Sequence, residues 1–183
     1  MQISGRLIIA VVLSLAVAMS GGAWLYQYSY SRQAAAFWGS EAAQLIVKSP
    51  QLDLLELAPA GSDRDAGPVD GERIAGQPIA AEHDLSGKPG LIHLRHVFTQ
   101  DSNFDWNAKR REPASGSRDW GYALRFADGD RRQIVLLDHD FKLLGKPSAD
   151  GQQVDLLPCS RLTLSLVRYL TDVGPLPAST PAE

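Results

Sequence analysis

Cysteine is nearly absent from this sequence. Cys159 is the only cysteine among the 183 residues. A single thiol cannot close a disulfide within the chain, and it cannot build a cysteine-rich metal site. Because Leu157, Leu162 and Leu164 lie close to it in the chain, we expect the thiol to be buried as a small apolar group.

A surplus of positive charge is also lacking. The chain has 18 basic and 21 acidic residues, which gives a net charge of −3 at pH 7. Arg6 is the only charged residue before a long hydrophobic run, so the rest of the chain carries 17 basic and 21 acidic residues. Nucleic-acid-binding domains normally present a basic surface. The composition therefore argues against a nucleic-acid partner.

Motifs of catalysis and cofactor binding are missing as well. The chain has no Gly-x-Ser-x-Gly turn and no glycine-rich phosphate loop after a predicted strand. His93 and His96 stand three residues apart on a predicted strand, where their side chains point to opposite faces and cannot share a metal ion. We expect no cofactor and no metal ion, and the sequence favours a protein that is not an enzyme.

A long hydrophobic run is present near the N-terminus. Leu7 to Tyr26 is a stretch of 20 residues without a charge, and a helix of that length spans about 30 Å, the thickness of a bilayer core. Arg6 precedes it, and Trp24, Tyr28 and Tyr30 provide aromatic side chains suited to a membrane boundary. We expect residues 1–30 to be a cytoplasmic stub and a transmembrane anchor in the plasma (inner) membrane, with the following domain outside the cytoplasm.

The same run also fits a cleaved signal peptide. Ala16 and Ala18, or Ala18 and Ser20, are small residues at the spacing that a signal peptidase recognises. In this alternative the domain is secreted after cleavage.

The remainder predicts one extracytoplasmic domain over residues 31–174, a loop over Pro59 to Gly76 and a disordered tail over residues 175–183. The Asp128-Gly129 turn signal and other short links favour antiparallel pairing. The expected fold class is α+β: an N-terminal transmembrane helix, then a small antiparallel meander sheet packed by one or two helices. The expected elements are helices over Ser31 to Val47 and Ser160 to Thr171, and strands over Gln51 to Ala58, Leu91 to Thr99, Tyr122 to Ala127, Ile134 to Leu137 and Phe141 to Leu144. Val154 to Leu157 is expected to be either a last strand or the lead-in to the second helix.

The connection from Gln100 to Asp119 is the first candidate site. Long loops without regular structure are uncommon and are often functional, and aromatic and arginine side chains anchor many protein interfaces. The sequence therefore predicts a non-catalytic binding or accessory protein of the cell envelope, which docks a protein partner through this connection. The predicted anchors are Phe104, Trp106, Arg110, Arg111 and Trp120.

An alternative site involves His93, Arg95 and Asp138. His93 and Arg95 share one face of the predicted strand Leu91 to Thr99, and Asp138 lies in a predicted tight turn. A single sheet could bring the three side chains into one cleft. The alternative prediction is therefore a small-ligand-binding protein or a hydrolase with that cleft.

Overall fold

The structure is a computed structural model that describes residues 5–30, 32–59, 72–114 and 118–176. Residues 1–4 of the predicted cytoplasmic stub lie outside the described residues, as do most of the predicted loop Pro59 to Gly76 and most of the predicted tail.

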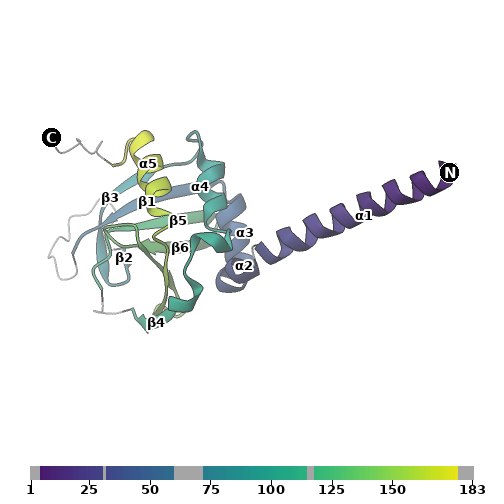
Figure 1. Ribbon diagram of the computed structural model, residues 1–183. Coiled ribbons are helices and arrows are strands. Elements are labelled where there is room, and N and C mark those ends of the chain that lie inside the picture. The colour runs from purple at the N-terminus through teal and green to yellow at the C-terminus, as the bar shows by residue number, and fades with distance from the viewer. Residues whose placement is uncertain (1–4, 31, 60–71, 115–117, 177–183) are drawn as a thin grey trace, which may run out of the picture.

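Three consecutive helices open the chain: α1 (Gly5–Tyr30), α2 (Arg32–Trp38) and α3 (Ser40–Lys48). Helix α1 projects away from the rest of the molecule (Figure 1), and its described side chains are exposed to solvent. Among the residues that the structure describes, no helix has both the length and the apolar character that crossing a membrane requires.

An eight-stranded antiparallel sheet forms the body of the molecule and curves into a half-barrel. Its strand order is β2-β3-β1-β5-β6-β7-β8-β4. The strands are β1 (Gln51–Leu57), β2 (Arg73–Ile74), β3 (Gln77–Asp84), β4 (Arg110–Pro113), β5 (Tyr122–Asp128), β6 (Arg131–Leu137), β7 (Leu143–Pro147) and β8 (Gln153–Pro158).

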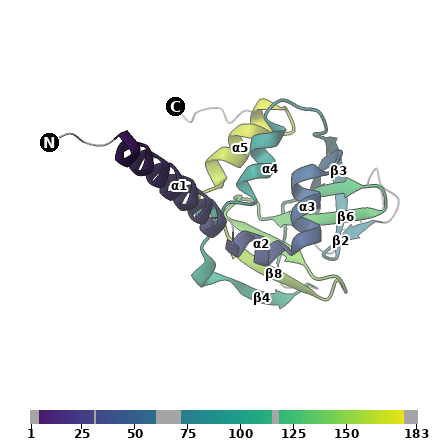
Figure 2. The ribbon, with the colours of Figure 1, turned by 90° about the vertical axis from the view of Figure 1, so that its right-hand side faces the viewer.

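The larger apolar core lies between the sheet and the helices. Helices α3, α4 (Leu91–Val97) and α5 (Thr163–Asp172) lie on one side of the sheet (Figure 2). They pack side chains such as Ile46, Phe98 and Leu166 against Leu124 and Phe126 of β5. Buried aliphatic side chains removed from water on this side supply the main driving force for folding.

A second apolar cluster lies on the opposite face of the sheet. Neighbouring residues of a strand point to opposite faces, so Leu124 belongs to the first cluster and Ala123 to the second. Trp120 is the largest side chain of the second cluster and is buried. Both faces of the central strands therefore carry apolar side chains.

The predicted strand Leu91 to Thr99 is wrong, because this segment forms helix α4. Leu94, Arg95 and Phe98 are buried, whereas Ile92 and His93 are exposed. This burial follows the helical spacing of three and four residues, and a short apolar run fits that period as well as the strand period. His93 and Arg95 consequently do not share the face of a strand.

The predicted fold class is also wrong. The protein is mostly sheet, with eight strands and a few helices, and no described helix meets the requirement for a transmembrane span. Three strands lie in segments where no strand was predicted. Strand β2 has two residues and falls within the predicted loop, and β3 and β4 are rich in polar residues and carry Pro78 and Pro113. The sheet as a whole is not a meander, since β1 lies between β3 and β5, and β4 pairs with β8 at the edge. Only the consecutive strands β5, β6, β7 and β8 follow the meander order among the described strands.

The predicted helix Ser31 to Val47 is instead two helices, α2 and α3, divided at Gly39. Several other predicted elements lie close to their predicted positions. The hairpin of β5 and β6 forms at the predicted Asp128-Gly129 signal: Asp128 is paired opposite Arg131, and Gly129 and Asp130 make the turn. Strand β1 and helix α5 also fall within about three residues of their predicted bounds, which is the usual uncertainty of an element's ends.

Candidate functional site

The predicted partner-binding connection is folded back onto the domain. It contains two short 3-10 helices, η1 (Asp101–Asn103) and η2 (Trp106–Ala108), followed by β4. Phe104 and Trp120 are 5% and 2% exposed, and Trp106 is half-buried. These three aromatic side chains therefore belong mainly to the interior of the protein.

Asp101 joins this connection to the first turn of α2. Its carboxylate accepts hydrogen bonds from the backbone N–H groups of Gln33 at 2.9 Å and Ala34 at 2.7 Å. The first N–H groups of a helix have no partner within it, and a carboxylate is well suited to accept from them. The Trp106 indole N–H donates to the Asp101 carbonyl oxygen at 2.8 Å. The connection thus fixes the helix that follows α1.

An aromatic cluster closes the other end of α2. The Phe37 ring lies 4.8 Å from Trp38 and 6.1 Å from Trp106, and Trp106 lies 5.4 Å from Phe104, all in edge-to-face contact. The Lys146 ammonium group donates to the carbonyl oxygens of Phe37 at 2.6 Å and Trp38 at 3.0 Å. Burial lowers the pKa of Lys146. A cation at the carbonyl end of a helix stabilises that end.

Arg110 and Arg111 lie on β4, at one edge of the sheet. Arg111 binds both carboxylate oxygens of Asp155 on β8, at 2.6 and 3.1 Å. This bond lowers the pKa of Asp155. Arg110 binds Glu112 at 2.9 Å. A short, charged edge strand that ends in proline is typical of sheets that avoid pairing with a second chain.

An open cavity of about 500 Å³ remains accessible beside the start of α2. Its polar rim brings side chains of the connection next to the first turn of α2. The rim includes Gln33, Asn103, Asp105, Trp106, Asn107 and Arg161. Among the predicted partner-binding residues, Phe104 and Trp106 both line this cavity and belong to the aromatic cluster.

The three residues of the alternative site do not come together in one cleft. His93 and Arg95 are on α4, where His93 is exposed and Arg95 is buried. Asp138 follows β6, and its carboxylate accepts from the backbone N–H groups of Lys142 at 2.7 Å and Leu143 at 3.0 Å. Asp138 therefore stabilises the turn between β6 and β7. No contact among the described residues joins it to His93 or Arg95.

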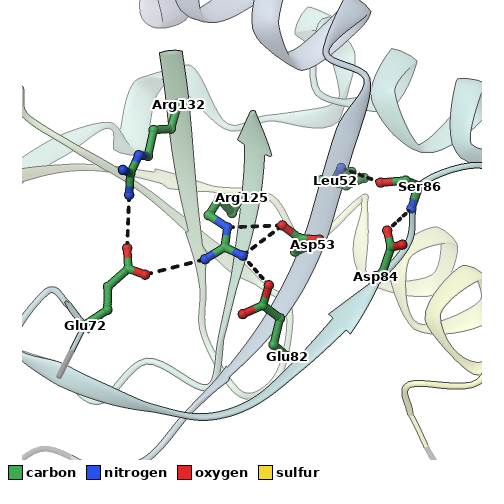
Figure 3. A network of polar contacts seen from close by, with 8 residues as sticks. All are labelled: Leu52, Asp53, Glu72, Glu82, Asp84, Ser86, Arg125 and Arg132. Atoms are coloured by element: carbon green, nitrogen blue, oxygen red, sulfur yellow. Dashed lines mark hydrogen bonds and ion pairs between the residues drawn. The ribbon is translucent and has the colours of Figure 1, made fainter. Parts of the chain in front are cut away.

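Sequence reasoning missed a charged cluster around Arg125 of β5 (Figure 3). Its guanidinium binds the Asp53 carboxylate through two nitrogens, at 3.0 and 3.1 Å. It also binds Glu82, and Glu72 lies 3.6 Å away. Burial lowers the pKa of Arg125, but Asp53 and the two glutamates outweigh burial and raise it. Finding this cluster requires the strand register, which places Asp53 directly opposite Arg125.

The described residues provide neither a reactive thiol nor a metal site. Cys159 is 1% exposed, and burial raises the pKa of its thiol to about 12, so the thiol stays protonated at neutral pH. Within residues 5–30, 32–59, 72–114 and 118–176, no group of three or more histidine, cysteine, aspartate or glutamate side chains is placed to hold a metal ion.

Comparison with known proteins gives no match: no protein-family model, no curated protein and no solved structure matches the chain.

Proposed function

We propose that the protein is a non-catalytic binding or accessory protein of the cell envelope, held at a membrane through residues Leu7 to Tyr26. One observation carries the proposal: α1 exposes apolar side chains in every direction. Val11, Val12 and Leu13 are 58%, 59% and 61% exposed, and successive helical residues point about 100° apart. A helix that is apolar all round is normally buried.

A lipid environment fits this surface better than a protein partner does. A partner helix covers one stripe of its neighbour, whereas the exposed apolar residues of α1 extend from Ile9 to Leu25 on all sides. A lipid phase covers the whole circumference, and each buried methylene then contributes about 0.8 kcal/mol.

The connection around Asp101 supports an accessory role for the domain. Asp101 and Trp106 hold α2 in place directly after α1, so the cavity lined by Asn107 and Arg161 stays close to the membrane-associated helix. In this proposal an envelope protein docks against the rim of that cavity. Its polar rim fits a polar segment of the partner.

Flotation of the full chain with vesicles of phosphatidylcholine and phosphatidylglycerol tests the membrane proposal. The wild-type protein should float with the vesicles, and Val12→Asp combined with Leu15→Asp should leave most of it at the bottom of the gradient. Leu164→Asp is the matched control, since Leu164 is 84% exposed on α5. Equal flotation of all three proteins, or no flotation of the wild type, would count against the proposal.

Cross-linking in native membranes tests the docking site. Asn107→Arg enlarges an exposed side chain on the cavity rim and should reduce recovery of a cross-linked partner. Gln152→Arg places the same side chain on an exposed residue outside that rim and should leave recovery unchanged. Unchanged recovery with Asn107→Arg would remove the cavity from the proposal.

A further inference from the structure

Arg95 is a buried cation that forms no ion pair with the residues that the structure describes. Its residue is 8% exposed. Its only hydrogen bond within the described part of the chain is donated to the carbonyl oxygen of Val47, at 3.2 Å. The Nε–H group is buried and has no partner. A guanidinium group has five N–H donors, so capping the end of α3 leaves most of them unused.

Two further buried polar groups, one just after α3 and one on α5, also lack hydrogen-bond partners among the described residues. The hydroxyl groups of Ser49 and Tyr169 are buried and have no hydrogen-bond partner. Burial lowers the pKa of Arg95, and the Tyr169 phenol counteracts part of this effect. Buried polar groups in folded proteins are nearly always satisfied, and buried charges are nearly always paired.

An open cavity of about 260 Å³ lies directly over Arg95 and Ser49. Its walls include the apolar side chains of Val47, Pro50, Leu91 and Ile92. Ile92 is 80% exposed, which is unusual for a large apolar side chain outside α1. At about 30 Å³ for each water-sized group, the cavity has room for roughly nine non-hydrogen atoms. It combines an apolar wall with three polar groups: the Arg95 guanidinium, the Ser49 hydroxyl and the His96 imidazole.

We propose that this cavity binds a small carboxylate that carries an apolar tail. The carboxylate would take the unused donors of Arg95 and the hydroxyl of Ser49, and the tail would lie against Val47, Leu91 and Ile92. Arginine binds carboxylates through two parallel hydrogen bonds. A carboxylate carries one negative charge, which matches the one guanidinium group among the lining residues, whereas a doubly charged phosphate would place more negative charge beside the apolar wall.

Isothermal titration calorimetry of the full chain with three probes tests this assignment. Sodium hexanoate supplies both the charge and the tail, acetate supplies only the charge, and 1-hexanol supplies only the tail. Hexanoate should bind at least about tenfold more tightly than either of the others, because only it satisfies both halves of the cavity. Inorganic phosphate is a fourth probe, and it should bind more weakly than hexanoate.

Matched variants locate the binding. Arg95→Met should weaken hexanoate binding at least about tenfold, and Ser49→Ala should weaken it less. Arg168→Met is the control, because Arg168 has an 86% exposed side chain on α5. Equal binding of hexanoate and 1-hexanol, tighter binding of phosphate, hexanoate binding unchanged in Arg95→Met, or no binding of hexanoate would each overturn the proposal. The membrane proposal does not depend on any of these results.

Discussion

Arg125 and Arg95 are both largely buried guanidinium groups, but they have very different neighbours. Arg125 lies on the sheet face that carries the second apolar cluster, among Asp53, Glu72 and Glu82. Arg95 lies under the helices on the other side, with one backbone carbonyl as its hydrogen-bond partner. Arg125 is therefore surrounded by three carboxylates, whereas Arg95 has no carboxylate partner among the described residues.

The difference follows from how each arginine is positioned. The antiparallel register of β1 and β5 places Asp53 opposite Arg125, and that of β1 and β3 brings Glu82 alongside. Cross-strand neighbours of opposite charge stabilise a sheet, so this cluster is part of the fold. Helix α4 instead docks through Leu94 and Phe98, and its arginine is carried into the interior without an acid. The second arrangement suits a ligand that arrives from outside.

Arg125→Met is expected to have the largest effect on stability, because it removes the arginine that is paired with carboxylates. Removing the guanidinium leaves three carboxylates close together and partly buried, so we expect the free energy of unfolding to fall by about 2–3 kcal/mol. Urea denaturation at neutral pH measures this change. Arg131→Met is the control, because the Arg131 side chain is 54% exposed. A loss below about 0.5 kcal/mol for Arg125→Met would show that the cluster does not hold the sheet together.

Arg95→Met should have a smaller effect of the opposite sign. Methionine removes an unpaired buried charge and keeps much of the side chain's apolar stem. The lost hydrogen bond to Val47 offsets part of the gain, so we expect the free energy of unfolding without ligand to rise by up to about 1 kcal/mol. The same urea experiment applies. A loss of about 2 kcal/mol or more would mean that Arg95 has a stabilising partner within the chain.

The smallest effect concerns Arg111, an exposed arginine that is paired. Its hydrogen bonds lower the pKa of Asp155 in the folded protein below the ordinary value of about 3.9. The resulting stability is present above that ordinary value and is lost as the pH falls through the folded pKa. In Asp155→Asn the free energy of unfolding should therefore decrease less between pH 6 and pH 3 than in the wild type. Parallel pH profiles of the two proteins would contradict this interpretation.

Local signals predicted part of this fold. The Asp128-Gly129 turn and the alternation around it indicate the hairpin of β5 and β6, because both signals lie within one short stretch of sequence. Helix α5 is predictable for the same reason. The strand pairing is not, since Arg125 and Asp53 are 72 residues apart and only the register brings them together. Helix α4 was misread because its short apolar run fits both periods.

The candidate sites show the same limit. Aromatic residues occur both in interfaces and in cores, so residue type could not reveal that Trp120 is buried. The Trp120 ring lies over Gly145, where an added Cβ atom would come within 2.6 Å of it. Arg95 was selected from the sequence, but its unpaired state depends on which side chains α3 and α5 bring near it.

The central claim is that Arg95, unlike Arg125, has no negatively charged partner among the described residues and binds a carboxylate from solution. A ¹H–¹⁵N spectrum of the arginine Nε–H groups of the full chain tests it most directly, with the Arg95 signal assigned from its absence in Arg95→Met. On titration with sodium hexanoate, the Arg95 signal should move and saturate while the Arg125 signal stays in place. Signals that both stay in place, or that move together in proportion to added salt, would contradict the claim.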